Sequence, residues 1–227
     1  MVYKPMMSQK EIRIRKKWHD AGYLPMADRP DVTVTCLGRK FVVPKEVHPP
    51  ALMTLLQKTI LKEVKEADHV LDMGTGSGVN AVLAASKASR VTAVDVNPNA
   101  VKCAKNNAKL NHVSSRIKVF HSDLFRNVKG KFDLIIFDPP FRWFKPRDIR
   151  ERATADENFR TMRTFFKNVR KYLNKDGRIL TCYGTNGDMR YFQYLLDKNN
   201  FEVKTLNEKS LIRYGRKWMF YSYQLTP

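Results

Sequence analysis

The tetrapeptide Asp138-Pro139-Pro140-Phe141 follows an apolar run that is typical of a buried strand. Two successive prolines end the hydrogen-bond ladder of a strand and stiffen the chain after it. We expect this turn to hold the Asp138 carboxylate and the Pro139 carbonyl as two fixed acceptors, with Phe141 as an aromatic face. A planar amino group has two N–H donors and a π system that match this arrangement. Accepting both N–H bonds would raise the electron density on its nitrogen, so positioning and electrostatics would carry the chemistry.

A second group of residues, Asp72 followed by Gly74, Gly76 and Gly78, lies earlier in the chain. Glycines let the backbone turn sharply and let a ligand approach without interference from a Cβ. The spacing G-x-G-x-G differs from the G-x-G-x-x-G of dinucleotide folds, and no lysine follows as in a phosphate-binding P-loop. The Asp72 carboxylate would repel a pyrophosphate but suits a cationic ligand. Asp95, at the end of the next expected strand, is placed to accept hydrogen bonds from both hydroxyls of a ribose.

Strand and helix patterns alternate from residue 69 onward, which indicates how these groups are positioned. Two final strands have no helix between them. The pattern predicts an α/β fold with a Rossmann-like, seven-stranded, mostly parallel sheet and an antiparallel edge hairpin. Ligands of such a sheet bind outside the carboxyl ends of its strands. The expected strands are 70–72, 90–96, 117–120, 132–137, 178–182, 202–206 and 217–224.

Residues 1–66 are expected to form an N-terminal extension, and residues 67–227 the α/β domain. Within the extension, the sequence predicts a basic helix over 8–19, a hairpin of strands 32–36 and 40–43, and a lead-in helix over 51–65.

The Gly-rich loop with its two acids resembles the class I S-adenosylmethionine-dependent methyltransferases. The resemblance implies that the cofactor is S-adenosylmethionine, with S-adenosylhomocysteine as product. It places the methionine part against Asp72 and the glycines, the ribose at Asp95, and the adenine between Asp123 and Leu124. The implied cofactor residues are Asp72, Gly74, Thr75, Gly76, Gly78, Asp95, Val96, Asp123 and Leu124.

The Asp138 tetrapeptide resembles the [N/D]-P-P-[F/Y] signature of amino-methyltransferases. Together with the segments 122–125 and 48–50, it is similar to the small-domain group, which includes HemK-type glutamine methyltransferases and rRNA guanine-N2 methyltransferases. The HemK type carries Asn where this chain has Asp138. The resemblance therefore implies methyl transfer to an exocyclic base amine, adenine N6 or guanine N2. Two alternatives stay open, a protein glutamine N5-methyltransferase and a non-catalytic nucleic-acid-binding module.

The charge balance points to a polyanionic partner. The chain has 42 Lys+Arg against 22 Asp+Glu, a net charge of +20. Basic residues interleaved with aromatics follow Phe141 directly, as a splayed-out base and its phosphates require. We expect RNA or a ribosomal particle as partner, with DNA as a possible polymer and general solubility as the alternative explanation of the charge. The candidate substrate-binding residues are Arg142, Trp143, Phe144, Lys145 and Arg147.

The sequence lacks the patterns that indicate disulfides, zinc sites, membrane helices or secretion. The three cysteines, Cys36, Cys103 and Cys182, lie far apart and form no disulfide framework or C-x-x-C site, and the five histidines show no zinc-binding spacing. No apolar run approaches the roughly 18 residues of a membrane helix, and the basic N-terminus lacks the apolar segment of a secretory signal. We expect a cytoplasmic monomer without a metal or a membrane anchor.

Overall fold

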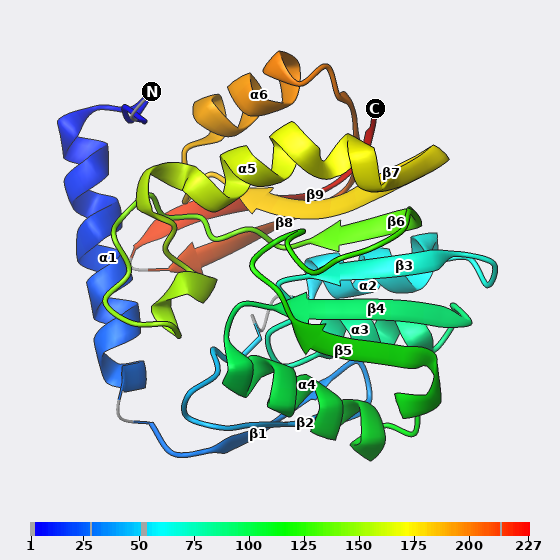
Figure 1. Ribbon diagram of the computed structural model, residues 1–227. Coiled ribbons are helices and arrows are strands. Elements are labelled where there is room, and N and C mark those ends of the chain that lie inside the picture. The colour runs from blue at the N-terminus through cyan, green and yellow to red at the C-terminus, as the bar shows by residue number, and fades with distance from the viewer. Residues whose placement is uncertain (1–2, 28, 51–53, 214) are drawn as a thin grey trace.

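A seven-stranded sheet forms the centre of the molecule (Figure 1). The computed structural model describes residues 3–27, 29–50, 54–213 and 215–227. The strand order is β5-β4-β3-β6-β7-β9-β8; β3 to β7 run parallel, and β9 is antiparallel to both β7 and β8. This confirms the expected mostly parallel sheet with an antiparallel edge pair. The strands are β3 (His69–Met73), β4 (Arg90–Asp95), β5 (Ile117–His121), β6 (Phe132–Phe137), β7 (Leu173–Gly184), β8 (Glu202–Arg213) and β9 (Arg216–Thr226).

The strand order brings three loops to one point of the sheet edge. The chain builds outward from β3 to β5 and then returns to place β6 on the other side of β3. Met73 of β3 pairs with Val94 of β4 and with Phe137 of β6. The loops that follow these three strands therefore begin side by side, at the switch point where α/β sheets bind their ligands.

Helices cover both faces of the sheet. One face packs against α2 (Leu55–Glu63), α3 (Val79–Ala85) and α4 (Pro98–Leu110), and the other against α5 (Arg160–Asn168) and α6 (Met189–Lys198). Because the central strands are buried from both sides, they are almost continuously apolar: the side chains of β6 from residue 134 to 136 are fully buried. Short 3₁₀ turns lie at Ser114–Arg116, Glu151–Ala153, Glu157–Phe159 and Val169–Tyr172.

The N-terminal region packs onto this core. Helix α1 (Gln9–Ala27) begins near the predicted position but continues about two turns further, with Pro25 in its last turn. Strands β1 (Val32–Cys36) and β2 (Arg39–Val43) form the predicted hairpin, and the Val42 backbone exchanges two hydrogen bonds with the Asn107 amide of α4. The predicted helix over 51–65 corresponds to α2, and residues 51–53 lie outside the described residues. The domain boundary at residue 66 stays a prediction.

Gly78, which precedes α3, sits where a side chain would be crowded by the neighbouring helix. Its φ is +85°, and a Cβ added there would lie 3.0 Å from the Ala104 Cα of α4. We expect Gly78→Ala to lower the free energy of unfolding by about 2–4 kcal/mol, from backbone strain plus overpacking. Gly130 is a matched control, because its φ is +86° but an added Cβ would meet nothing within 4 Å.

Gly130→Ala should therefore cost only the backbone strain, about 1–2 kcal/mol. Urea unfolding of both variants gives the comparison, and equal losses would show that the contact with α4 is not tight.

Candidate active site

The loop between β3 and α3 is held open beside its glycines. The amides of Gly74 and Thr75 both donate to the Val94 carbonyl of β4, at 2.9 Å each, which fixes the loop against the neighbouring strand. Gly74 and Gly76 have φ values of +73° and +54°, and a Cβ added at either would meet no atom within 4 Å. The space that a side chain would occupy is therefore available to a ligand.

Asp72 carries a buried and unsatisfied carboxylate. The residue is 1% exposed, and no described residue donates a hydrogen bond to either carboxylate oxygen. The buried Thr75 hydroxyl in the same loop has no partner within the described part of the chain either. Burial raises the pKa of Asp72 to about 7, helped by the charges of Asp95 and Asp138 and opposed by the nearby Thr75 hydroxyl and Ala81 amide, which lower it. Buried polar groups are nearly always hydrogen-bonded, so this carboxylate is suited to a ligand that brings cationic donors.

Asp95, at the end of β4, shapes the same loop. One of its carboxylate oxygens accepts a hydrogen bond from the Gly76 amide at 2.8 Å, and the other accepts one from the Asn97 amide at 2.8 Å. Burial raises the pKa of this carboxyl in spite of the two bonds. The sequence did not indicate this contact with the loop. Each oxygen keeps a further lone pair, which leaves the predicted ribose contact possible.

The end of β5 lies beside the end of β4. The Ser122 amide donates to the Asp95 carbonyl at 3.0 Å, and the Ser122 hydroxyl donates to the Leu124 carbonyl at 2.6 Å. These bonds hold Leu124 at a φ of +49°, next to an exposed Asp123 that lies 3.8 Å from Arg152. Val96, which follows Asp95, is half-buried, and its carbonyl lies 3.1 Å from a ring nitrogen of His121. The structure thus brings the two predicted cofactor segments together.

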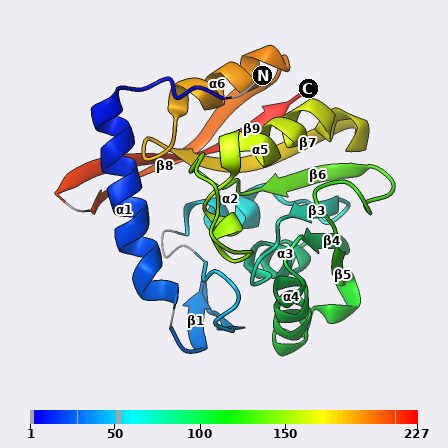
Figure 2. The same cartoon turned by 60° about the vertical axis from the view of Figure 1, so that its left-hand side comes forward.

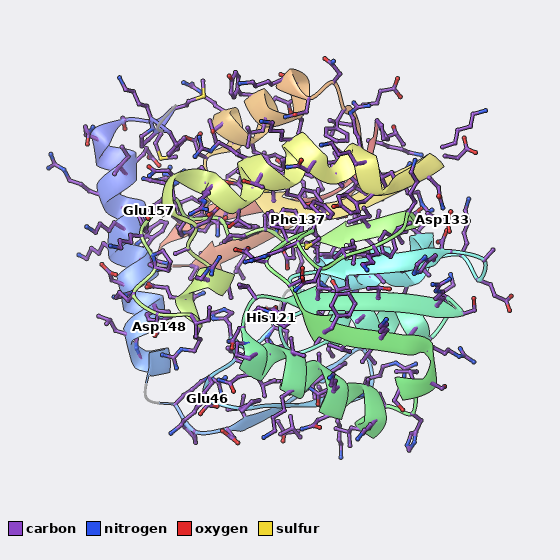
Figure 3. All side chains as sticks on the ribbon, in the orientation of Figure 1. Glu46, His121, Asp133, Phe137, Asp148 and Glu157 are labelled. Carbon is purple, nitrogen blue, oxygen red and sulfur yellow. The ribbon has the colours of Figure 1, made fainter. Side chains whose placement is uncertain are left out.

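These observations fit S-adenosylmethionine. The open glycine backbone and the unpaired Asp72 carboxylate would hold its methionine part, whose ammonium and sulfonium groups are cationic. The Asp95 carboxylate and the turn formed by Asp123 and Leu124 lie on the side where its nucleoside would extend. In Figure 3, Phe137 and His121 mark the carboxyl ends of β6 and β5 around this region, and Asp133 marks the opposite edge of the sheet.

The turn after β6 presents two free acceptors. Asp138 is exposed to solvent, whereas Pro139 and Pro140 are buried. No described residue donates a hydrogen bond to the Asp138 carboxylate or to the Pro139 carbonyl. Although the residue reaches solvent, the protein around it desolvates the Asp138 carboxyl and raises its pKa to about 7. The half-buried Phe141 ring lies 4.7 Å from the Tyr183 ring, so the aromatic face is supported from behind.

The five candidate substrate residues after this turn have different surroundings. Trp143 is only 9% exposed and packs among the rings of the core, so it offers no free face to a base. Phe144 is half-buried, with its ring 5.6 Å from that of His19. The Arg142 guanidinium donates to the Asn186 carbonyl at 2.8 Å, and burial lowers its pKa to about 10. Lys145 is exposed.

Arg147, the last of the five, joins a partly buried cluster around Glu151 that the sequence did not indicate. Its guanidinium donates to both carboxylate oxygens of Glu151, which is 2% exposed, and also pairs with Asp20 of α1 at 3.2 Å. The same Glu151 accepts a hydrogen bond from His19 Nε2 at 2.7 Å. Burial alone would raise the pKa of Glu151, but the hydrogen bonds from Arg147 and His19 lower it. This cluster ties α1 to the segment that follows Asp138.

No helix among the described residues is both long enough and apolar enough to cross a membrane. No group of three or more His, Cys, Asp or Glu side chains in the described ranges is arranged to hold a metal ion.

The chain is similar to known methyltransferases. Residues 51–211 match the family model described as methyltransferase small domain. A protein of Methanocaldococcus jannaschii, named provisionally as a protein N5-glutamine methyltransferase, is 48% identical over 105 residues, which are 46% of this chain and 52% of that protein. A tRNA1(Val) (adenine(37)-N6)-methyltransferase of a Flavobacteriaceae bacterium is 35% identical over 107 residues, which are 45% of this chain and 46% of that protein.

Solved structures share the fold. The crystal structure of the M. jannaschii tRNA m1G37 methyltransferase superposes with a TM-score of 0.65 at 20% identity, over 87% of this chain and 57% of that one. At this identity the likeness shows the fold alone. The chain spans about half the length, or less, of the curated relatives it matches.

The raised pKa of Asp72 predicts a stability effect with a definite sign. The folded carboxyl binds a proton more tightly than the unfolded one, whose pKa is 3.8. The ligand-free protein therefore loses stability as the pH rises from about 4 to about 7. We expect Asp72→Asn to stabilise the ligand-free protein by roughly 2–4 kcal/mol at pH 8, with little gain at pH 4. The same variant should bind S-adenosylmethionine at least about tenfold more weakly.

Asp133→Asn is the matched control for this experiment. Burial alone would raise the pKa of Asp133, but hydrogen bonds from the His69 amide and the Asn174 amide lower it. Its replacement should destabilise the protein at neutral pH and leave cofactor affinity unchanged. Urea unfolding at several pH values and isothermal titration calorimetry measure both effects. A less stable Asp72→Asn protein with normal cofactor affinity would contradict the assignment.

Proposed function

The chain belongs to the methyltransferase small domain family, a family of class I S-adenosylmethionine-dependent methyltransferases, and we propose that it methylates an exocyclic amine of a nucleic-acid base in RNA. The target nitrogen would be adenine N6 or guanine N2. One observation carries the proposal: the exposed Asp138 carboxylate and the free Pro139 carbonyl stand beside the glycine loop that fits the cofactor.

S-adenosylmethionine, when bound, supplies an electrophilic methyl group on its sulfonium. The chain's own residues would bind and orient the acceptor. Asp138 and the Pro139 carbonyl would accept the two N–H bonds of the amino group, which fixes its plane and raises the electron density on nitrogen. Phe141 would stack against the base, supported by Tyr183. Once the nitrogen has been methylated it must lose a proton, and the Asp138 carboxylate already accepts that N–H bond.

The charge of the protein supports a nucleic acid as the substrate. The net charge of +20 favours a polyanion over a neutral side chain as partner. Asp138 supports the same reading, because the HemK-type glutamine methyltransferases that the motif resembles carry Asn at this position. The relative from the Flavobacteriaceae bacterium is named for adenine N6 in a tRNA, which is chemistry of this kind.

A glutamine side chain is the second candidate substrate. The 48% identity to the M. jannaschii protein, which is named for glutamine N5, favours it over the matched 105 residues. A glutamine amide also has a planar NH₂ group with two donors, so the turn after β6 would accept it in the same way. On this alternative the basic surface would serve to dock a ribosome or a release factor.

A labelling experiment separates the two substrates. The protein is incubated with S-adenosylmethionine carrying a labelled methyl group and with an extract of cells that lack this enzyme. We expect label that is removed by ribonuclease and recovered as an N-methylated nucleoside. Label that resists ribonuclease and is removed by protease would support the glutamine alternative.

Asp138→Ala tests the role of the turn. Loss of one of two acceptors should lower kcat by at least about 100-fold, because the interaction acts on the reacting nitrogen. Cofactor affinity, measured by calorimetry, should stay within about twofold. Asp138→Asn is the informative partner variant, since it keeps an acceptor oxygen of the same shape and should keep more activity than Asp138→Ala. An alanine variant with full activity would exclude the proposed role.

A further inference from the structure

Helix α1 stands at the edge of the sheet where the active site lies. In Figure 1 the arrowheads of β4, β5 and β6 point toward the side of the molecule on which α1 runs, and Figure 2 shows the same helix upright along that side. In Figure 3, Asp148, from the segment that follows the Asp138 turn, lies next to α1, and its carboxylate accepts a hydrogen bond from Tyr23. The helix therefore borders the approach to the carboxyl ends of the parallel strands.

The inner face of α1 is fixed to that edge by buried contacts. Arg15 donates to the Thr185 carbonyl at the end of β7, at 2.7 Å. His19 bonds to the buried Glu151, and the Tyr23 hydroxyl donates to Asp148 at 2.6 Å. The position of the helix relative to the Asp138 turn is thus set by side chains along most of its length.

The outer face of α1 is basic and uncompensated. Its two acids are already engaged, since Glu11 binds Arg15 and Arg216, and Asp20 pairs with Arg147. Among the residues that the structure describes, none forms an ion pair with the four exposed cations of this helix. These exposed cations are Lys10, Arg13, Lys16 and Lys17.

We propose that Lys10, Arg13 and Lys17 form a phosphate-binding stripe that docks the RNA backbone beside the Asp138 turn. The inference rests on the proposed function and adds the surface that recognises the substrate. Residues spaced i, i+3 and i+7 lie on one face of a helix. The stripe spans about 10 Å along the helix axis, at roughly 1.5 Å per residue, and the phosphates of one strand of a DNA duplex recur about every 3.4 Å along the duplex axis. The stripe is therefore long enough for about three phosphates.

A second lysine stripe provides the rival surface and the control. Lys102, Lys105 and Lys109 are exposed on α4 with the same i, i+3, i+7 spacing, beside a hollow of about 500 Å³. Helix α4 starts at the carboxyl edge after β4 and runs back along the sheet toward β5. Its lysines therefore lie progressively further from the sheet edge that carries Asp138. Helix α1, by contrast, is bonded to the segment that follows Asp138. RNA held on α4 would be directed away from the reacting groups.

The test compares two variants of equal charge. One carries Lys10→Gln, Arg13→Gln and Lys17→Gln, and the other carries Lys102→Gln, Lys105→Gln and Lys109→Gln. Glutamine has nearly the helix propensity of lysine, so both should fold, which circular dichroism verifies. The probe is a fluorescein-labelled RNA oligonucleotide of mixed sequence, followed by fluorescence anisotropy at increasing NaCl. Cofactor affinity is measured in parallel.

We expect the α1 variant to bind the RNA about 10- to 100-fold more weakly at 0.1 M salt, and to lower the slope of log K against log salt by about 2 to 3. The α4 variant should lose less than about threefold, and both should bind S-adenosylmethionine normally. Equal losses in the two variants, or a larger loss in the α4 variant, would overturn the proposal. So would an α1 variant that binds RNA normally but transfers less methyl to protein. Because binding is measured without turnover, this result stands apart from whether a base amine is the methyl acceptor.

Discussion

The carboxylate of Asp72, buried without a partner at the point where three strands end, is the constraint around which the site is organised. The sheet order places β3 between β4 and β6, so the acids that follow or end these strands must lie close together. Burial, and then the charges of Asp95 and Asp138, raise the pKa of Asp72, so its ionised form is unfavourable in the ligand-free site. A bound cationic ligand would pair with the Asp72 carboxylate and remove the cost of its burial. The energy of this pairing would then help to fix the orientation of the ligand. The largely buried strands β3 and β6 stabilise the fold and so offset the cost of this site.

Residues 3–27 are bonded to loops at the edge of the sheet where the site lies. The Tyr3 hydroxyl donates to Asp188, the N-cap residue of α6, and His19 binds the buried Glu151 on the segment after the Asp138 turn. Burial lowers the pKa of His19, so the neutral imidazole donates Nε2–H to the carboxylate at neutral pH. Helix α1 and the segment that precedes it are therefore bonded to two loops of the carboxyl edge. The same helix carries basic residues outward, which links the surface that would meet a polyanion to the turn that would hold its base.

Local sequence patterns predicted the sheet and the cofactor loop. The strand and helix periods gave the sheet, and Asp72 with its glycines gave the cofactor loop, because each signal lies within a few consecutive residues. The Glu151 cluster was not predictable, since its two partners are separated by 132 residues and nothing in either residue type marks it as buried. Trp143 was expected to face substrate because it stands among basic residues, but neighbouring rings enclose it. The last seven residues of β8 were missed because this exposed edge has no apolar alternation and depends on pairing with β9.

Proton release on cofactor binding tests the central claim most directly. Calorimetry of S-adenosylmethionine binding at pH 7, in buffers of different ionisation enthalpy, counts the protons exchanged. A carboxyl whose pKa is raised to about 7 is partly protonated at that pH and must ionise to pair with the cation. The account predicts a net release of protons from the wild-type protein and a markedly smaller release from Asp72→Asn. Binding without proton release, or with equal release from both proteins, would contradict it.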